Sequence, residues 1–226
     1  MPHSARLRHV LRACAEGQPA PTAAPTSGGG ADGPTVVTSK GAVQGLAIDG
    51  VNTFRGLPFA APPVGALRFK RSVPPEPWEG VLSCVEFGAV APQLTPEPGQ
   101  ECDEDCLTLN VYNEQGNVGA PVFVWVHGGA FTSGSGSNAG YDGATLAKTG
   151  LCVVSINYRL GALGWAKLKN GDANCGLWDQ IRALQWVQEE IVGFGGDPAN
   201  VTVAGESAGG TSVLSLLASP TANQLL

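Results

Sequence analysis

The sequence is poor in features that define several classes of protein. It holds six cysteines in 226 residues, too few for a small scaffold built on disulfides. Glycine, proline or serine interrupts every long uncharged stretch, so no segment reaches the roughly 20 apolar residues of a membrane-spanning helix. Lysine and arginine number 13 against 19 acidic residues, and the resulting net charge of −6 argues against a nucleic-acid-binding protein.

What the sequence does contain favours a folded domain. Hydrophobic residues make up 43% of the chain, which is enough for a core and excludes a wholly disordered protein. The 32 glycines and 17 prolines indicate many tight turns between short elements. At roughly 150 residues per domain, the length fits one large domain or two small ones.

The first 34 residues lack the pattern of a folded element. Residues 15–34 are rich in proline, alanine, glycine and threonine and cannot bury enough apolar surface to become ordered. Residues 1–15 carry three arginines and no acid, but no apolar run follows as it would in a secretory signal. We expect 1–34 to be a disordered tail and linker, with a misplaced start codon or a mitochondrial transit peptide as alternatives. A cytoplasmic location is favoured over secretion.

The folded part begins at Thr35 and alternates strands with helices. Short apolar runs predict strands at 35–38, 42–48, 51–54, 107–112, 122–126, 151–156 and 201–203. Asp49-Gly50 predicts a hairpin turn, and six prolines predict an irregular path over 57–80.

Two segments change to a helical period. Apolar residues from Leu177 to Ile191 recur every three or four positions, which predicts an amphipathic helix. Residues 208–218 predict a second helix, with Val213, Leu214 and Leu217 on its buried side. The order of elements favours an α/β fold, in which strands 122–126 and 151–156 are buried on both faces of a largely parallel sheet.

The last predicted strand and helix are joined by Gly205-Glu206-Ser207-Ala208-Gly209, a G-x-S-x-G pattern. In a nucleophile elbow, such a turn presents the central serine at the edge of the sheet, and glycines avoid clashes in the tight turn. The pattern alone fits a plain turn equally well. Its place between a strand and a helix makes Ser207 the candidate nucleophile.

A second motif, His127-Gly128-Gly129-Ala130-Phe131, follows the strand 122–126. A loop of small residues there lets backbone N–H groups approach a substrate oxygen closely, although a flexible turn is the simpler explanation of an isolated HGG. Together with the elbow, the loop predicts an oxyanion hole formed by the N–H groups of Gly129, Ala130 and Ala208. His127 and Gly128 are expected to line the site.

With both motifs in place, the chain resembles the type-B carboxylesterases of the α/β-hydrolase superfamily from about Val36 to its last residue. The resemblance is carried by residues 62–69, 104–107, 125–131, 141–143, 157–161, 176–180, 194–198 and 200–210. It implies an α/β-hydrolase fold with a mixed, largely parallel sheet and flanking helices. It also implies hydrolysis of carboxylic esters through an acyl-serine intermediate.

The resemblance implies two further features. Glu206, beside the nucleophile, lines the site in that family, or is simply a tolerated residue of the turn. A disulfide would pair Cys84 with Cys106, although Cys102 competes for the same partner. No tryptophan lies in residues 85–105, where the cholinesterase branch carries one, so the resemblance favours an esterase of broad specificity over a choline-ester specialist.

The catalytic base and its acid are missing from the sequence. In this fold they follow the serine, yet no Asp, Glu or His follows Ser207. The other histidines, His3 and His9, lie in the expected tail. We therefore expect residues 35–226 to be the N-terminal portion of a catalytic domain, with later strands and helices absent, a hydrophobic sheet edge open, and the chain alone poorly soluble and nearly inactive.

Two other functions stay open at this stage. The chain could be a non-catalytic interaction protein of the same fold, although Ser207 and the complete HGGA loop argue against it. It could also be a truncated gene product without function. No pattern indicates a cofactor or a metal, so the expected partner is a small ester, while the oligomeric state and the ester specificity stay undetermined.

Overall fold

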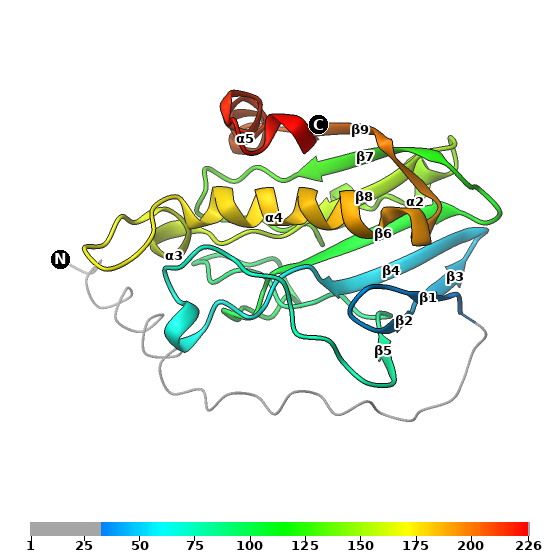
Figure 1. The fold of residues 1–226 in the computed structure, drawn as a ribbon, viewed down its shortest axis with the longest axis horizontal. Coiled ribbons are helices and arrows are strands. Elements are labelled where there is room, and N and C mark those ends of the chain that lie inside the picture. The colour runs from blue at the N-terminus through cyan, green and yellow to red at the C-terminus, as the bar shows by residue number, and fades with distance from the viewer. Residues whose placement is uncertain (1–32, 226) are drawn as a thin grey trace. The chain divides into compact units, whose positions relative to one another are not determined.

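The structure is a computed structural model that describes residues 33–225 (Figure 1). The tail and linker expected over 1–34 lie almost wholly outside the described residues, so that expectation stays a prediction. The described part begins with a small sheet in the order β1-β2-β5, formed by β1 (Thr35–Val37), β2 (Ala42–Gln44) and β5 (Val81–Ser83). The sequence did not predict β5, which has only three residues and follows the proline-rich path.

A six-stranded sheet in the order β3-β4-β6-β8-β7-β9 carries the rest of the fold. Its strands are β3 (Leu46–Ile48), β4 (Val51–Pro58), β6 (Thr108–Glu114), β7 (Ala120–Val126), β8 (Cys152–Ile156) and β9 (Gly196–Gly205). Only β8, β7 and β9 are parallel; the other pairings are antiparallel, so the sheet is more mixed than expected. The predicted Asp49-Gly50 turn between β3 and β4 is confirmed, with φ of 48° and 81°.

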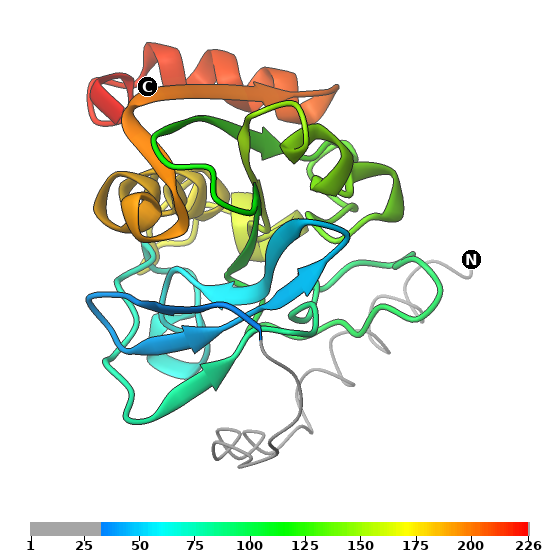
Figure 2. The ribbon, with the colours of Figure 1, turned by 90° about the vertical axis from the view of Figure 1, so that its right-hand side faces the viewer.

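Helices cover both faces of this sheet (Figure 2). They are α2 (Ala144–Ala147), α3 (Gly161–Trp165), α4 (Cys175–Glu190) and α5 (Ala208–Ala218), with short 3-10 turns at Gly65–Leu67, Ala139–Tyr141, Ile191–Phe194 and Asn223–Leu225. The main core lies between α4 and one face, where Leu184 and Val187 pack near Val124 and Val154. A smaller core lies on the other face, where Ala147 of α2 packs near Tyr112 and Val153.

The burial predicted for two elements is partly wrong. All five residues of β8 are buried, as expected, but Phe123 and Trp125 of β7 are only partly buried. On α5, Leu214 and Leu217 are 69% and 54% exposed, and Leu216 is buried in their place. The reason is the docking of the first turn of α5 against β7, described below, which fixes the face that turns inward.

Candidate active site

The candidate site forms where two parallel neighbours, β7 and β9, end at the same edge of the sheet. Their register pairs Val126 with Gly205, the last residue of each strand. The HGG loop therefore leaves β7 directly beside the point where the G-x-S-x-G turn leaves β9. Two motifs that lie about 80 residues apart in the sequence are brought together by this one pairing.

Ser207 occupies the turn between β9 and α5 in an unusual backbone conformation. Its φ is 55° and its ψ is −118°, and its side chain is exposed. A positive φ is costly for a residue other than glycine, and such strain persists only where the surrounding structure imposes it. The strand and the helix on either side hold Ser207 in this turn, with its side chain open to solvent.

The glycines of the G-x-S-x-G motif are required by close packing. A Cβ added to Gly209 would lie 2.0 Å from the carbonyl oxygen of Val126. A Cβ added to Gly205 would lie 2.5 Å from the carbonyl carbon of Gly209. Both distances are far below any real contact, so only glycine lets α5 begin this close to β7.

The HGG loop adjoins Ser207 directly. A Cβ added to Gly128 would lie 2.7 Å from a carboxylate oxygen of Glu206 and 3.2 Å from the Cβ of Ser207. The loop then bends sharply, with φ of 108° at Gly129, 53° at Ala130 and 61° at Phe131. Glu206 thus lies beside the loop, and its role in lining the site stays a prediction.

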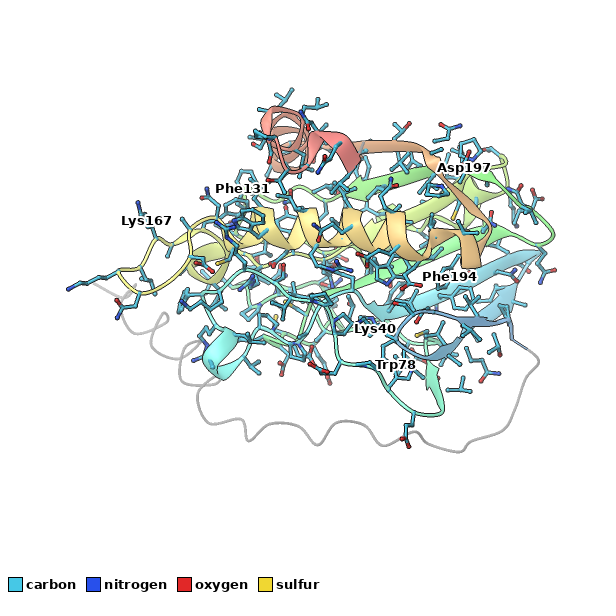
Figure 3. The ribbon with its side chains drawn as sticks, viewed as in Figure 1. Lys40, Trp78, Phe131, Lys167, Phe194 and Asp197 are labelled. Atoms are coloured by element: carbon cyan, nitrogen blue, oxygen red, sulfur yellow. The ribbon has the colours of Figure 1, made fainter. Side chains whose placement is uncertain are left out.

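Three hydrogen bonds and one ring contact hold the bent loop in place. The carbonyl oxygen of Gly129 accepts hydrogen bonds from the N–H groups of Thr132 and Ser133, both at 3.0 Å. The carbonyl oxygen of Phe131, which is labelled in Figure 3, accepts one from Gly161 at 2.8 Å. The ring of Phe131 packs edge-on against Trp165 of α3, with ring centroids 4.6 Å apart. Within residues 33–225, the N–H groups of Gly129, Ala130 and Ala208 donate no hydrogen bond. Two backbone donors of the loop and one directly after Ser207 are therefore free for a ligand.

His127 lines the base of the loop but is unsuited to accept a proton from Ser207. Its side chain is 1% exposed, and its Nδ1 lies 2.8 Å from the carbonyl oxygen of Gly128, so Nδ1 carries the hydrogen. Burial lowers the pKa of His127 from 6.5 to about 4, and the hydrogen bond to Gly128 opposes this only in part. The ring stacks on that of Tyr158, with ring centroids 4.4 Å apart, and this contact fixes its orientation.

The burial of His127 predicts a pH dependence of folding. In the unfolded chain its pKa returns to about 6.5, so the unfolded state binds the extra proton first as the pH falls. The stabilisation is complete above pH 6.5 and is lost as the pH falls towards 4, by about 3 kcal/mol in the free energy of unfolding. Urea unfolding at pH 7.5, 5.5 and 4.5 measures this loss in the free energy of unfolding. A His127→Gln variant should lack the share of the pH dependence that comes from His127. An imidazole of His127 that titrates near pH 6.5 would contradict the prediction.

Two residues that the sequence reasoning missed support the loop. The hydroxyl of Tyr158 donates a hydrogen bond to the carbonyl oxygen of His127 at 2.8 Å. The side-chain amide of Gln93 donates to the carbonyl oxygen of Gly134 at 3.0 Å and accepts from its N–H at 2.9 Å. Tyr158 lies inside a motif that carries the resemblance, but its contact with a residue 31 positions earlier cannot be derived from spacing.

The disulfide between Cys84 and Cys106 that the resemblance implies stays a prediction. Cys84 and Cys106 are both buried free thiols in the structure, and Cys102 is an exposed one. Burial raises the pKa of Cys84 to about 12 and that of Cys106 well above its usual value, so both stay protonated.

Residues 33–225 contain no cluster of three or more His, Cys, Asp or Glu side chains that could hold a metal ion. Nor does any helix in this part of the chain have the length and apolar character needed to cross a membrane.

Comparison with known proteins gives a consistent result. A family model described as "Carboxylesterase family" matches residues 32–226. The chain is 47% identical over 204 residues to the para-nitrobenzyl esterase of Bacillus subtilis. This match covers 84% of this chain and 41% of that protein. It is 43% identical over 232 residues to the medium-chain fatty acyl-CoA hydrolase precursor of Anas platyrhynchos. That match covers 90% of this chain and 41% of that protein.

A solved structure of PNB esterase superposes with a TM-score of 0.82 at 46% identity, over 85% of this chain and 42% of that one. The chain thus spans about two fifths of the length of the proteins to which it is similar.

Proposed function

Because the chain belongs to the carboxylesterase family and forms part of an α/β-hydrolase fold, we propose that it supplies the nucleophile and the oxyanion hole of a serine esterase. In the proposed reaction, the Oγ of Ser207 attacks the carbonyl carbon of a carboxylic ester. The carbonyl π bond opens and its electron pair moves onto the oxygen. The resulting oxyanion accepts hydrogen bonds from the free N–H groups of Gly129, Ala130 and Ala208.

The remaining steps follow from the same geometry. When the carbonyl re-forms, the bond to the alcohol oxygen breaks, the alcohol leaves with the proton that the Ser207 hydroxyl gave to the base on attack, and Ser207 is left acylated. Water then attacks the acyl group and releases the acid. The N-terminus of α5, an 11-residue helix that begins at Ala208, adds a favourable dipole at the oxyanion in both stages.

The observation that carries this proposal is the strand register. The pairing of Val126 with Gly205 puts three unoccupied N–H donors and a strained, exposed serine at one edge of the sheet. This arrangement supports acyl transfer to Ser207, for which a base is also needed.

The base is proposed to lie outside residues 33–225, because His127 is the only histidine in this part of the chain and is held neutral in the core. Residues 35–226 are accordingly proposed to be the N-terminal portion of the catalytic domain. We expect the 226-residue chain alone to retain at most the roughly 10³–10⁴-fold acceleration over water that an oxyanion hole with substrate binding can supply.

The test is ester turnover by the protein expressed from its complete gene. We expect hydrolysis of p-nitrophenyl butyrate at ordinary enzyme rates, on the order of 1–10³ per second. The same assay on the 226-residue chain should give only the weak residual rate. A complete gene product without turnover, whose Ser207 also resists acylation, would favour a non-catalytic interaction protein instead.

A further inference from the structure

A polar cavity of about 240 Å³ opens beside the HGG loop. Gly128 and Gly129 form one wall, and the segments 93–100 and 133–141 form the others. Ligand sites usually measure 300–1,000 Å³ and are mostly apolar. Because this cavity is smaller than that range, it suits one substituent of a substrate better than a whole ligand.

Internal hydrogen bonds fix the polar groups of this cavity. Gln93 is bonded twice to Gly134, and the amide nitrogen of Gln100 donates to the hydroxyl of Ser135 at 2.8 Å. Asn138 donates from its side chain to the carboxylate of Glu97. The walls therefore hold amides and hydroxyls in fixed orientations. A bound apolar chain would cover these groups without replacing their hydrogen bonds to water, which is unfavourable.

The cavity also has unused hydrogen-bonding capacity. In the described part of the chain, the hydroxyls of Thr95 and Tyr141 form no hydrogen bond, and both residues line the cavity. Glu97 adds a carboxylate, and no lysine or arginine lines the walls. A ligand group with several O–H donors satisfies these atoms, whereas an anionic group meets the Glu97 carboxylate without a cation to balance it.

We infer that this cavity is a subsite for a hydroxylated substituent of the ester, such as a polyol or a sugar. The inference rests on the proposed function, because it places the subsite next to the loop that holds the oxyanion. The inference assigns to Gln100 a role in specificity. The side-chain amide of Gln100 forms part of the cavity wall and donates a hydrogen bond to Ser135 on the neighbouring wall. The substrate class is therefore carboxylic esters that carry hydroxyl groups near the ester bond.

The binding test compares two five-carbon probes, xylitol and 1-pentanol, on the full 226-residue chain by amide NMR. We expect xylitol to shift the resonances of Gly128, Gly129 and Gly134 saturably and to bind at least tenfold more tightly than 1-pentanol. Gln100→Met, which keeps the side-chain length, should remove this preference. Gln115→Met, at an exposed turn away from the cavity, is the matched control and should leave it unchanged.

A kinetic test on the protein from the complete gene is independent of how the shorter chain behaves. Gln100→Met should lower kcat/KM for glycerol monobutyrate at least tenfold relative to butyl butyrate. Equal binding of the two probes, or an unchanged kinetic ratio in this variant, would overturn the inference. Gln100-dependent xylitol binding by a complete protein that retains Ser207 but shows no ester turnover would instead reject the proposed function alone, so the two failures are distinguishable.

Discussion

Replacing Ser207 with alanine is expected to lower kcat for ester hydrolysis by about 10⁶-fold in the protein expressed from its complete gene. The change removes the only atom proposed to bond to the acyl carbon. It leaves the free N–H groups of the HGG loop and of Ala208 in place, so a weak acceleration over water should persist. Steady-state hydrolysis of p-nitrophenyl butyrate measures both rates.

Ser215→Ala is the matched control for this prediction. Ser215 lies on the same helix, is exposed, and donates a hydrogen bond to the carbonyl oxygen of Thr211 at 2.9 Å. Its replacement should change kcat by less than twofold, since it lies two helical turns beyond Ser207. A Ser207→Ala variant within tenfold of the wild-type rate would mean that another residue attacks the ester.

Gly209→Ala is expected to lower the free energy of unfolding by about 3 kcal/mol, at the upper end of the usual cost of overpacking. The added Cβ would lie 2.0 Å from the carbonyl oxygen of Val126, which is backbone and cannot rotate away. Either α5 or the end of β7 must move, and both movements displace Ser207 relative to the HGG loop. A displacement of 1 Å can cost about 10²-fold in rate, so activity should fall as well.

The adjacent residue provides the control for this second prediction. At Gly210 the nearest atom to an added Cβ is the carbonyl oxygen of Gly205 at 3.3 Å, and alanine favours a helix over glycine. Gly210→Ala should therefore change the free energy of unfolding by less than 1 kcal/mol. Urea unfolding followed by tryptophan fluorescence compares the two variants, and equal stabilities would show that the close approach of α5 to β7 is not required.

The sequence predicted the elements whose signals are local. The Asp49-Gly50 turn has positive φ at both residues, and the apolar spacing from Leu177 to Ile191 corresponds to α4 and the 3-10 turn that follows it. The G-x-S-x-G turn and the HGG loop follow strands β9 and β7, as the sequence predicted, because each motif of small residues comes directly after an apolar run.

Features that depend on tertiary packing could not be predicted in this way. Strand β9 is ten residues long rather than three, because its first residues pair with Ala120 and Pro121 across an irregularity in register. The inward face of α5 was misassigned because it depends on how closely Gly209 approaches Val126, not on which residues are most apolar. The hydrogen bond from the Tyr158 hydroxyl to the carbonyl oxygen of His127 likewise joins distant segments, so it could not be predicted from local sequence.

The most direct test of the central claim is covalent labelling of the protein as its own cells produce it. A fluorophosphonate reacts with an activated serine, and mass spectrometry of the digested protein locates the adduct. The account predicts one phosphonate per molecule, on the Oγ of Ser207. An adduct on a different residue, or an unlabelled protein that nevertheless hydrolyses esters, would contradict it.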